Sequence, residues 1–278
     1  MFQTFTLMTT LTVILLVVGW LFGSIIGMGI AFAIALIINF GTYWYSDKMV
    51  LKMYKAKPYE NKELEKIIEN LTGEAKLPAT PKLYIMETQV PNAFATGRDY
   101  RHAVIAVTRG LLDLNKAELK GVLAHEISHI KNKDILIGTI AAAVAGAISF
   151  IAQIGYYSLF FSNDRDGKGN MLGLILIVIF APIAALLVRM SISRGREYKA
   201  DFTGALLTKE PEALGSALRK IADIAKANPI KGSAATSHLW VVNPLHKDWF
   251  VDMFSTHPAV EKRIKKLDEM SGELRYSE

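Results

Sequence analysis

The stretch HEISHIKNKDILIGTI, from His125 to Ile140, combines two features that rarely meet in one segment. It places two histidines and a glutamate at metal-binding spacing, and it then enters a run without a charged residue from Ile135 to Phe161. A membrane-spanning helix needs about 20 apolar residues, and this run is long enough. The sequence therefore predicts a metal-binding helix that ends at a membrane.

The residues around the two histidines have the pattern of one helix, NKAELKGVLAHEISHIKNKD. Asn115 can cap this helix, and Glu118 three residues later completes a capping box. His125 and His129 are four residues apart, so both imidazoles leave one face and can reach a zinc ion at about 2.0 to 2.1 Å. Glu126 leans toward the same face, where it can deprotonate a water molecule. Two structural histidines on a buried helix are the alternative, and the cap and helical phase favour catalysis.

A catalytic zinc ion needs a third protein ligand and one open position. The extended pattern HExxHxxGxxH is absent, because Asn132 replaces its glycine and Ile135 its last histidine. The helical segment SRGREYKADFTGALL supplies an acid instead: Glu197 can bind zinc, and Asp201, one turn on, can accept a hydrogen bond from a ligand histidine. From spacing alone, Glu197 has an alternative as a solvated helix charge paired with a nearby basic residue.

The composition places part of the chain in a membrane. A hydrophobic content of 51% and a mean hydropathy of +0.25 are too apolar for an ordinary soluble protein, while 21% charged residues leave room for a soluble portion. The absence of cysteine excludes disulfides and a cysteine-ligated metal, and it fits a reducing compartment. The net charge of +6 comes without a basic run interleaved with aromatics, which argues against nucleic acid and favours an anionic membrane surface.

The first 46 residues contain no charged residue, which is enough for two spanning helices and a turn at Gly23–Ser24. A cleaved signal peptide is the alternative, but a basic n-region and a small-residue cleavage signature are both missing. Gly19, Gly23 and Gly27 also form a series of small residues that can pack helices closely. We favour the turn, and we expect an N-terminal transmembrane hairpin over residues 1–46.

A second pair of spans is expected at residues 135–161 and 171–188, joined by the polar loop SNDRDGKGN. Buried core helices are the alternative, but two long uncharged runs with a short polar loop favour a membrane hairpin. Basic residues flank one side of the predicted spans, whereas Arg165 and Lys168 on the other side are offset by acids. Both termini and all the polar sequence are therefore expected in the cytoplasm. The flanking basic residues are Lys48, Lys52, Lys55, Lys57, Lys131, Lys133, Arg189, Arg194 and Arg196.

The polar sequence divides into residues 47–134, before the second hairpin at 135–188, and residues 189–278 after it. In the first part ENKELEKIIENL has helical periodicity, PKLYIM and HAVIAV have the pattern of short strands, and NAFATG is a possible third strand. We expect a catalytic part with a small sheet and the HExxH helix, and a helical part that carries the third zinc ligand.

Five motifs, HEISH, EYKAD from Glu197, VPNAFATG, SHLWVVNPL and FSTHP, resemble those of the HtpX-type integral-membrane zinc metalloproteases, relatives of the CaaX prenyl proteases. The similarity runs nearly end to end. It implies a gluzincin-like α+β catalytic domain with one zinc ion, facing the cytoplasm at the cell (inner) membrane. It also implies Glu197 as the third ligand and a role in stress-related quality control of membrane proteins.

Two further sets of residues follow from this resemblance. Asn92, Ala93 and Phe94 resemble the family's edge strand, to which an extended substrate can add as another strand. An ordinary sheet edge is the alternative. His257, before Pro258, resembles the family's late histidine and can donate to a developing oxyanion, although a capping or structural role is nearly as well supported.

The expected protein is thus a mainly α membrane protein with four transmembrane helices and a cytoplasmic α+β zinc protease domain. The inserted second hairpin accounts for the 68 positions between His129 and Glu197. Zinc-dependent peptide hydrolysis with Glu126 as the base is expected, on cytoplasmic regions of misfolded or damaged membrane proteins or on unfolded polypeptides. Trimming of prenylated CaaX proteins is the first alternative. A membrane scaffold or chaperone with a structural, four-ligand zinc is the second.

Overall fold

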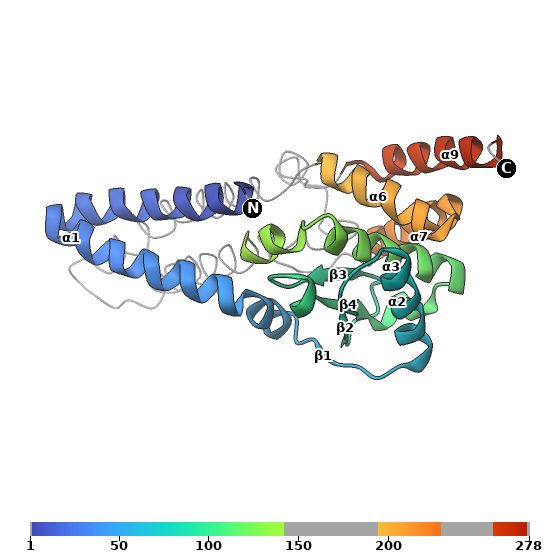
Figure 1. Cartoon of the computed structure of the whole chain (residues 1–278), viewed down its shortest axis with the longest axis horizontal. Coiled ribbons are helices and arrows are strands. Elements are labelled where there is room, and N and C mark those ends of the chain that lie inside the picture. The colour runs from blue at the N-terminus through green and yellow to red at the C-terminus, as the bar shows by residue number, and fades with distance from the viewer. Residues whose placement is uncertain (1, 142–193, 229–257, 277–278) are drawn as a thin grey trace.

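The structure is a computed structural model that describes residues 2–141, 194–228 and 258–276 (Figure 1). The helices are α1 (Phe2–Met53), α2 (Lys62–Glu74), α3 (Lys116–Lys131), α6 (Arg194–Thr208), α7 (Pro211–Ala227) and α9 (Val260–Tyr276). The strands are β1 (Lys57–Pro58), β2 (Lys82–Met86), β3 (Ala93–Thr96) and β4 (Val104–Thr108). Two 3₁₀ helices, Tyr100–His102 and Arg109–Asp113, flank β4. Residues 135–141 are also helical.

Helix α1 doubles back on itself, so that its two arms run side by side (Figure 1). The reversal lies at Ser24, whose φ of 52° is in the left-handed region, and the predicted turn at Gly23–Ser24 is confirmed. A Cβ atom added to Gly27 would overlap the carbonyl oxygen of Gly19, so the glycines also let the arms approach closely. Asn39 Nδ2 donates to Thr12 Oγ1 at 2.8 Å and joins the arms within their apolar surface.

The second arm of α1 has the properties of a membrane span. Among the described residues, Ser24–Met53 is the one helix that is long and apolar enough to cross a membrane, and Met8–Val17 is a shorter apolar segment in the first arm. The second arm exposes large apolar side chains, among them Ile26, Ile37 and Phe40, as a surface in contact with lipid would. The second predicted hairpin lies outside the described residues beyond position 141, so the count of four spans stays a prediction.

The sheet has the strand order β1-β2-β4-β3, with β2 and β4 parallel and the other two pairs antiparallel. The three strands predicted from PKLYIM, HAVIAV and NAFATG are confirmed. Strand β1 was not predicted, because two residues that include a proline carry no periodic pattern. Strand β3 has β4 as its neighbour on one side and forms an edge of this sheet.

Helix α3 packs in the centre of the catalytic part, against β3, α6 and α7. Its residues Val122, Leu123, Ile127 and Ile130 are completely buried, and each contributes about 1.5 to 3 kcal/mol by leaving water. The predicted capping box is confirmed at its N-terminus, where Asn115 and Glu118 bond each other's backbone N–H groups. The rigid placement of α3 fixes the two histidines on it.

A short junction connects α3 to the helix at residues 135–141. Helix α3 ends at Lys131, three residues before the predicted end, and Lys133 has a φ of 63° that turns the chain. The helix that follows buries Ile137 and Ile140 against Leu11 of α1. Thr139 on the same helix accepts a hydrogen bond from Gly97 N at 3.2 Å, at the end of β3. The helix after the junction therefore contacts both α1 and the end of the edge strand.

Candidate active site

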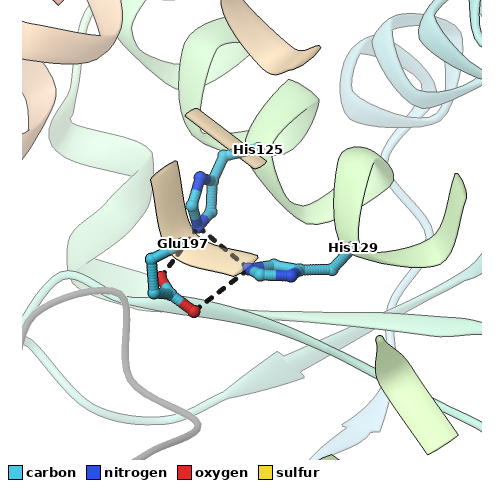
Figure 2. A group of neighbouring side chains, drawn as sticks. All are labelled: His125, His129 and Glu197. Carbon is cyan, nitrogen blue, oxygen red and sulfur yellow. Dashed lines mark hydrogen bonds and ion pairs between the residues drawn. The ribbon is translucent and has the colours of Figure 1, made fainter. Parts of the chain in front are cut away.

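Three side chains from two helices converge on one point (Figure 2). The Nε2 atoms of His125 and His129 on α3 are 3.2 Å apart. Glu197 on α6 places one carboxylate oxygen 3.7 Å from His125 Nε2 and the other 3.6 Å from His129 Nε2. Ligands about 2.0 to 2.1 Å from a tetrahedral ion lie about 3.3 to 3.4 Å from one another. The three predicted ligands are thus brought together at spacings that suit a zinc ion.

Small residues allow α6 to approach α3 at the level of these ligands. A Cβ atom added to Gly204 would lie 3.0 Å from the backbone nitrogen of His125 and 3.2 Å from the carbonyl carbon of Ala124. Ala200 and Ala205 on α6 are completely buried. The close crossing of the two helices lets the short side chain of Glu197 reach the histidines, although α6 follows α3 by many residues in sequence.

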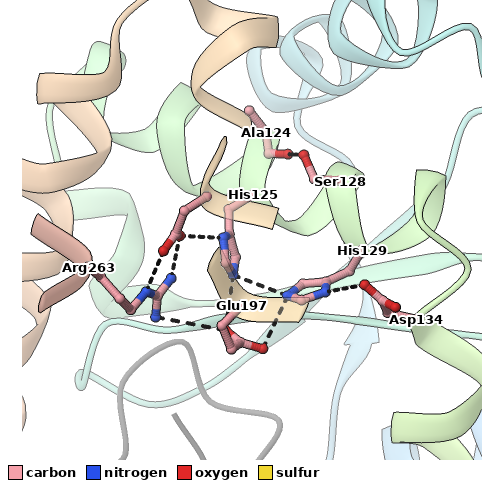
Figure 3. A network of polar contacts seen from close by, with 8 residues as sticks. Ala124, His125, Ser128, His129, Asp134, Glu197 and Arg263 are labelled. Atoms are coloured by element: carbon pink, nitrogen blue, oxygen red, sulfur yellow. Dashed lines mark hydrogen bonds and ion pairs between the residues drawn. The ribbon is translucent and has the colours of Figure 1, made fainter. Parts of the chain in front are cut away.

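The other ring nitrogen of each histidine faces a carboxylate (Figure 3). His125 Nδ1 lies 2.9 Å from Asp201 Oδ1, and His129 Nδ1 lies 3.3 Å from Asp134 Oδ2. A carboxylate that accepts a hydrogen bond from Nδ1–H keeps the proton on Nδ1 and leaves the Nε2 lone pair of the ring free to bind a metal. Asp201 lies next to a predicted ligand histidine, His125, as the sequence predicted. Asp134 was predicted only as the end of the zinc helix.

Arg263 on α9 completes the surroundings of Asp201, and sequence reasoning missed it. Its side chain is completely buried and donates to Asp201 from Nε at 2.8 Å and from Nη2 at 2.7 Å. Burial would raise the pKa of Asp201, but the Arg263 guanidinium holds this pKa well below its usual range. Arg263 Nη1 is also 3.9 Å from Glu197. One buried arginine thus contacts Glu197, a predicted ligand, and Asp201, the partner of His125.

Glu126 lies beside the three converging side chains and is only 3% exposed. Burial raises the pKa of this carboxyl above its usual range, while the charges of His125 and His129 oppose the rise. The backbone of Ala95, on the edge strand, also opposes the rise in the pKa of Glu126. A raised pKa suits a general base.

The acidic side chains around His129 raise its pKa. Burial alone would lower its pKa, but Glu197, Asp134 and Glu126 outweigh burial and raise the pKa of His129 to about 9. A metal ion competes with this proton, because a histidine must be neutral to bind one. The negative charges that hold the proton are the charges that attract a cation.

The edge strand β3 runs past Glu126 with some of its peptide groups turned outward. Asn92 O accepts from Thr108 N at 2.9 Å, so alternate residues of β3 pair with β4 and the intervening ones face away from it. The residues that face away from β4 are Ala93 and Ala95. The Phe94 side chain is buried against Tyr54, with ring centroids 5.3 Å apart. His257 lies outside the described residues, so its role at an oxyanion stays a prediction.

A HExxH helix that meets a glutamate from a second helix, next to a sheet edge, has the arrangement of a metal-dependent peptidase. The model of Peptidase family M48 matches residues 58–271, and this chain belongs to that family. The resemblance to the HtpX-type enzymes is confirmed, and the protein is a membrane metalloprotease that acts on polypeptides with the help of a metal ion.

The relatives match this chain over nearly its whole length. A protease HtpX homolog from Pyrococcus furiosus is 51% identical over 276 residues, which cover 96% of this chain and 95% of the relative. A protease HtpX homolog from Thermococcus sibiricus is 48% identical over 283 residues and covers 98% and 96% of the two chains. The crystal structure of S. mikatae Ste24p covers 91% of this chain and 67% of its own, with 20% identity and a TM-score of 0.44.

Proposed function

We propose that this protein is a zinc-dependent endopeptidase that cuts cytoplasmic regions of misfolded or damaged membrane proteins at the surface of the cell membrane. The observation that carries the proposal is the convergence of His125, His129 and Glu197, with the buried carboxylate of Glu126 beside them. Two imidazoles and one carboxylate are the ligand set of several catalytic zinc sites, which keep a fourth position open. We propose one zinc ion per chain.

The residues of the chain have distinct tasks in peptide hydrolysis. Bound zinc supplies Lewis-acid chemistry, which polarises a carbonyl and lowers the pKa of water toward about 7. Glu126 takes the proton of the attacking water and returns it to the leaving amine, and its raised pKa suits both steps. Asp201 holds His125 in the tautomer that binds metal. His257 is proposed to donate to the developing oxyanion.

The substrate is proposed to add to the edge of the sheet formed by Asn92, Ala93 and Phe94. The peptide groups of Ala93 and Ala95 that face away from β4 would supply hydrogen bonds to an extended chain, and the effect of the Ala95 backbone on the pKa of Glu126 supports a position of this edge next to Glu126. Only an unfolded segment can pair with an edge strand in this way. A preference for misfolded or unstructured regions follows from the geometry of the edge.

The membrane is proposed to deliver the substrate. The helix at 135–141 packs on the apolar hairpin of α1, and this end of the hairpin carries Lys48 and Lys52. Basic residues at this end favour a cytoplasmic location for the catalytic part and both termini, in a multi-pass protein with hairpins at 1–46 and 135–188. Confinement of enzyme and substrate to one bilayer raises their effective concentration.

A series of membrane-anchored substrates tests this proposal. The full chain is purified in its metal-loaded form and incubated with membrane-anchored substrate proteins. One substrate carries a cleavable sequence on a membrane-proximal cytoplasmic tail, and the others carry the same sequence on longer flexible spacers. The cleavage rate should fall as the spacer grows, and a chelator should stop cleavage until zinc is restored. Cleavage that is indifferent to distance would refute the membrane-surface site. Efficient trimming of a prenylated CaaX peptide, with poor cleavage of the tails, would favour the CaaX alternative.

A further inference from the structure

The carboxylate of Asp134 is placed against one of the proposed zinc ligands (Figure 3). Asp134 Oδ2 lies 3.3 Å from His129 Nδ1, and the two side chains are 14% and 16% exposed. The other oxygen of the carboxylate, Oδ1, lies 3.8 Å from Arg196 Nε, whose side chain is also 16% exposed. Arginine, aspartate and histidine therefore form a chain of contacts in a largely buried place.

This chain of contacts has a counterpart on the other ligand. Asp201 contacts His125 Nδ1 and is bonded in turn by Arg263. Each of the two histidines thus has a carboxylate on Nδ1, and each carboxylate has an arginine. The two carboxylates come from separate elements, since Asp201 lies on α6 and Asp134 follows the end of α3.

The turn at the end of α3 brings Asp134 to this position. On a continuous helix a residue five positions after His129 would point about 140° away from it. The structure instead ends α3 at Lys131 and gives Lys133 a φ of 63°. The backbone N–H of Asp134 then donates to the carbonyl oxygen of His129 at 2.9 Å, which folds the aspartate back under the imidazole.

We infer that Asp134, held by Arg196, is a positioning residue for His129: it accepts a hydrogen bond from Nδ1–H and aims Nε2 at the metal. The inference rests on the proposed function, because it takes His129 as a zinc ligand. Asp134 directly precedes the helix 135–141, which packs on α1 through Ile137. Asp134, which orients His129, therefore directly adjoins the helix that contacts α1.

A purely structural role makes a different prediction. Asp134 immediately precedes a helix, and an aspartate in this place can cap the helix. Asparagine caps a helix as well as aspartate does, so Asp134→Asn preserves the cap while it removes the negative charge from His129. Asp134→Ala removes both. The asparagine variant separates the two roles even where the alanine variant folds poorly.

The test measures metal binding by the full chain in detergent. Zn²⁺ is titrated against a chromophoric chelator, and the absorption spectrum of the Co²⁺-loaded protein reports the geometry of the site. We expect Asp134→Asn to raise the Kd for Zn²⁺ about 10-fold and Asp134→Ala about 10- to 100-fold, because loss of the hydrogen-bond partner of a metal ligand weakens metal binding by such factors. The Co²⁺ spectrum should shift in both variants. The exposed Asp113→Asn is the matched control and should bind as the unaltered protein does.

His129→Ala is measured in the same series, so that failure of this inference is distinct from failure of the proposed function. Loss of metal in His129→Ala together with an unchanged Kd and Co²⁺ spectrum in Asp134→Asn would overturn the positioning role and leave Asp134 as a helix cap. Retention of metal in His129→Ala would overturn the proposed zinc site itself, and the inference with it.

Discussion

Replacement of Arg263 by alanine should destabilise the catalytic part more than any surface change. Arg263 is completely buried and makes two hydrogen bonds to the buried Asp201. Removal of one partner of a buried ion pair costs about 3 to 5 kcal/mol, because the other charge stays buried without compensation. At about 2 to 4 °C per kcal/mol for a chain of this size class, the melting temperature should fall by about 6 to 20 °C.

The acid sensitivity of the variant should change in a defined direction. The pKa of Asp201 is depressed in the folded protein, so its pairing stabilises the fold above the ordinary carboxyl range, and this stabilisation is lost as the pH falls through the folded pKa. Without Arg263 the pKa of Asp201 rises, and unfolding by acid should begin at a higher pH. The variant should also bind zinc more weakly, because Asp201 orients His125.

Denaturant unfolding of the metal-free protein at several pH values measures these effects. Arg263→Lys should be intermediate, since lysine keeps the charge but not the two-pronged contact. Lys262→Ala is the matched control, because Lys262 is exposed on the same helix, and its effect should stay within about 0.5 kcal/mol. A free energy of unfolding for Arg263→Ala within about 1 kcal/mol of the unaltered protein, with an unchanged acid transition, would show that the Arg263–Asp201 pair does not stabilise the fold.

Three further results are expected. Glu197→Ala should lose zinc outright, whereas Asp201→Ala should weaken binding about 10- to 100-fold; metal analysis with the reverse ranking would make Asp201 the ligand. The acids around His129 raise its pKa to about 9 in the metal-free protein. Protonated His129 therefore stabilises the folded state fully below about pH 6.5, and this stabilisation is lost as the pH rises through 9. Calorimetry near pH 7.5 in two buffers should therefore show about one proton released per zinc bound, and no release would contradict this state. Thr139→Val should leave the buried Gly97 N–H without its acceptor and cost about 1 to 3 kcal/mol by thermal unfolding, whereas Thr139→Ser should be nearly neutral.

The parts of the site that depend on local spacing could be predicted from the sequence. The positions of His125, Glu126 and His129 follow from the period of one helix, and the Asn115 capping box marks where that helix begins. The strands of the sheet follow from apolar runs between turn residues. The turn at Ser24 follows from the length of an uncharged segment that is too long for one span.

The parts of the site that could not be predicted from the sequence depend on contacts between distant residues or on a single backbone angle. Arg263 is 62 positions from Asp201 and stands in the basic run KRIKK, which has the pattern of a solvated helix face. Asp134 is close to His129 in sequence, but a helix continued through it would have turned it away. The positive φ of Lys133 determines the position of Asp134, and a lysine in the sequence does not predict a positive φ. The small residues Ala200 and Gly204 on α6, four positions apart, were a signal for close helix packing that could have been used.

The role of Glu126 as the general base is tested by the metal content and the proteolytic activity of Glu126→Gln, measured on the same preparation. Glutamine has nearly the same shape as glutamate but cannot accept the proton of the attacking water. We expect the variant to fold, to keep its zinc and to fail to cleave a membrane-anchored tail that the unaltered protein cuts. Loss of zinc equal to the loss of activity would make Glu126 a ligand, and retained cleavage would remove it from the reaction; either result would contradict the assignment of Glu126 as the base.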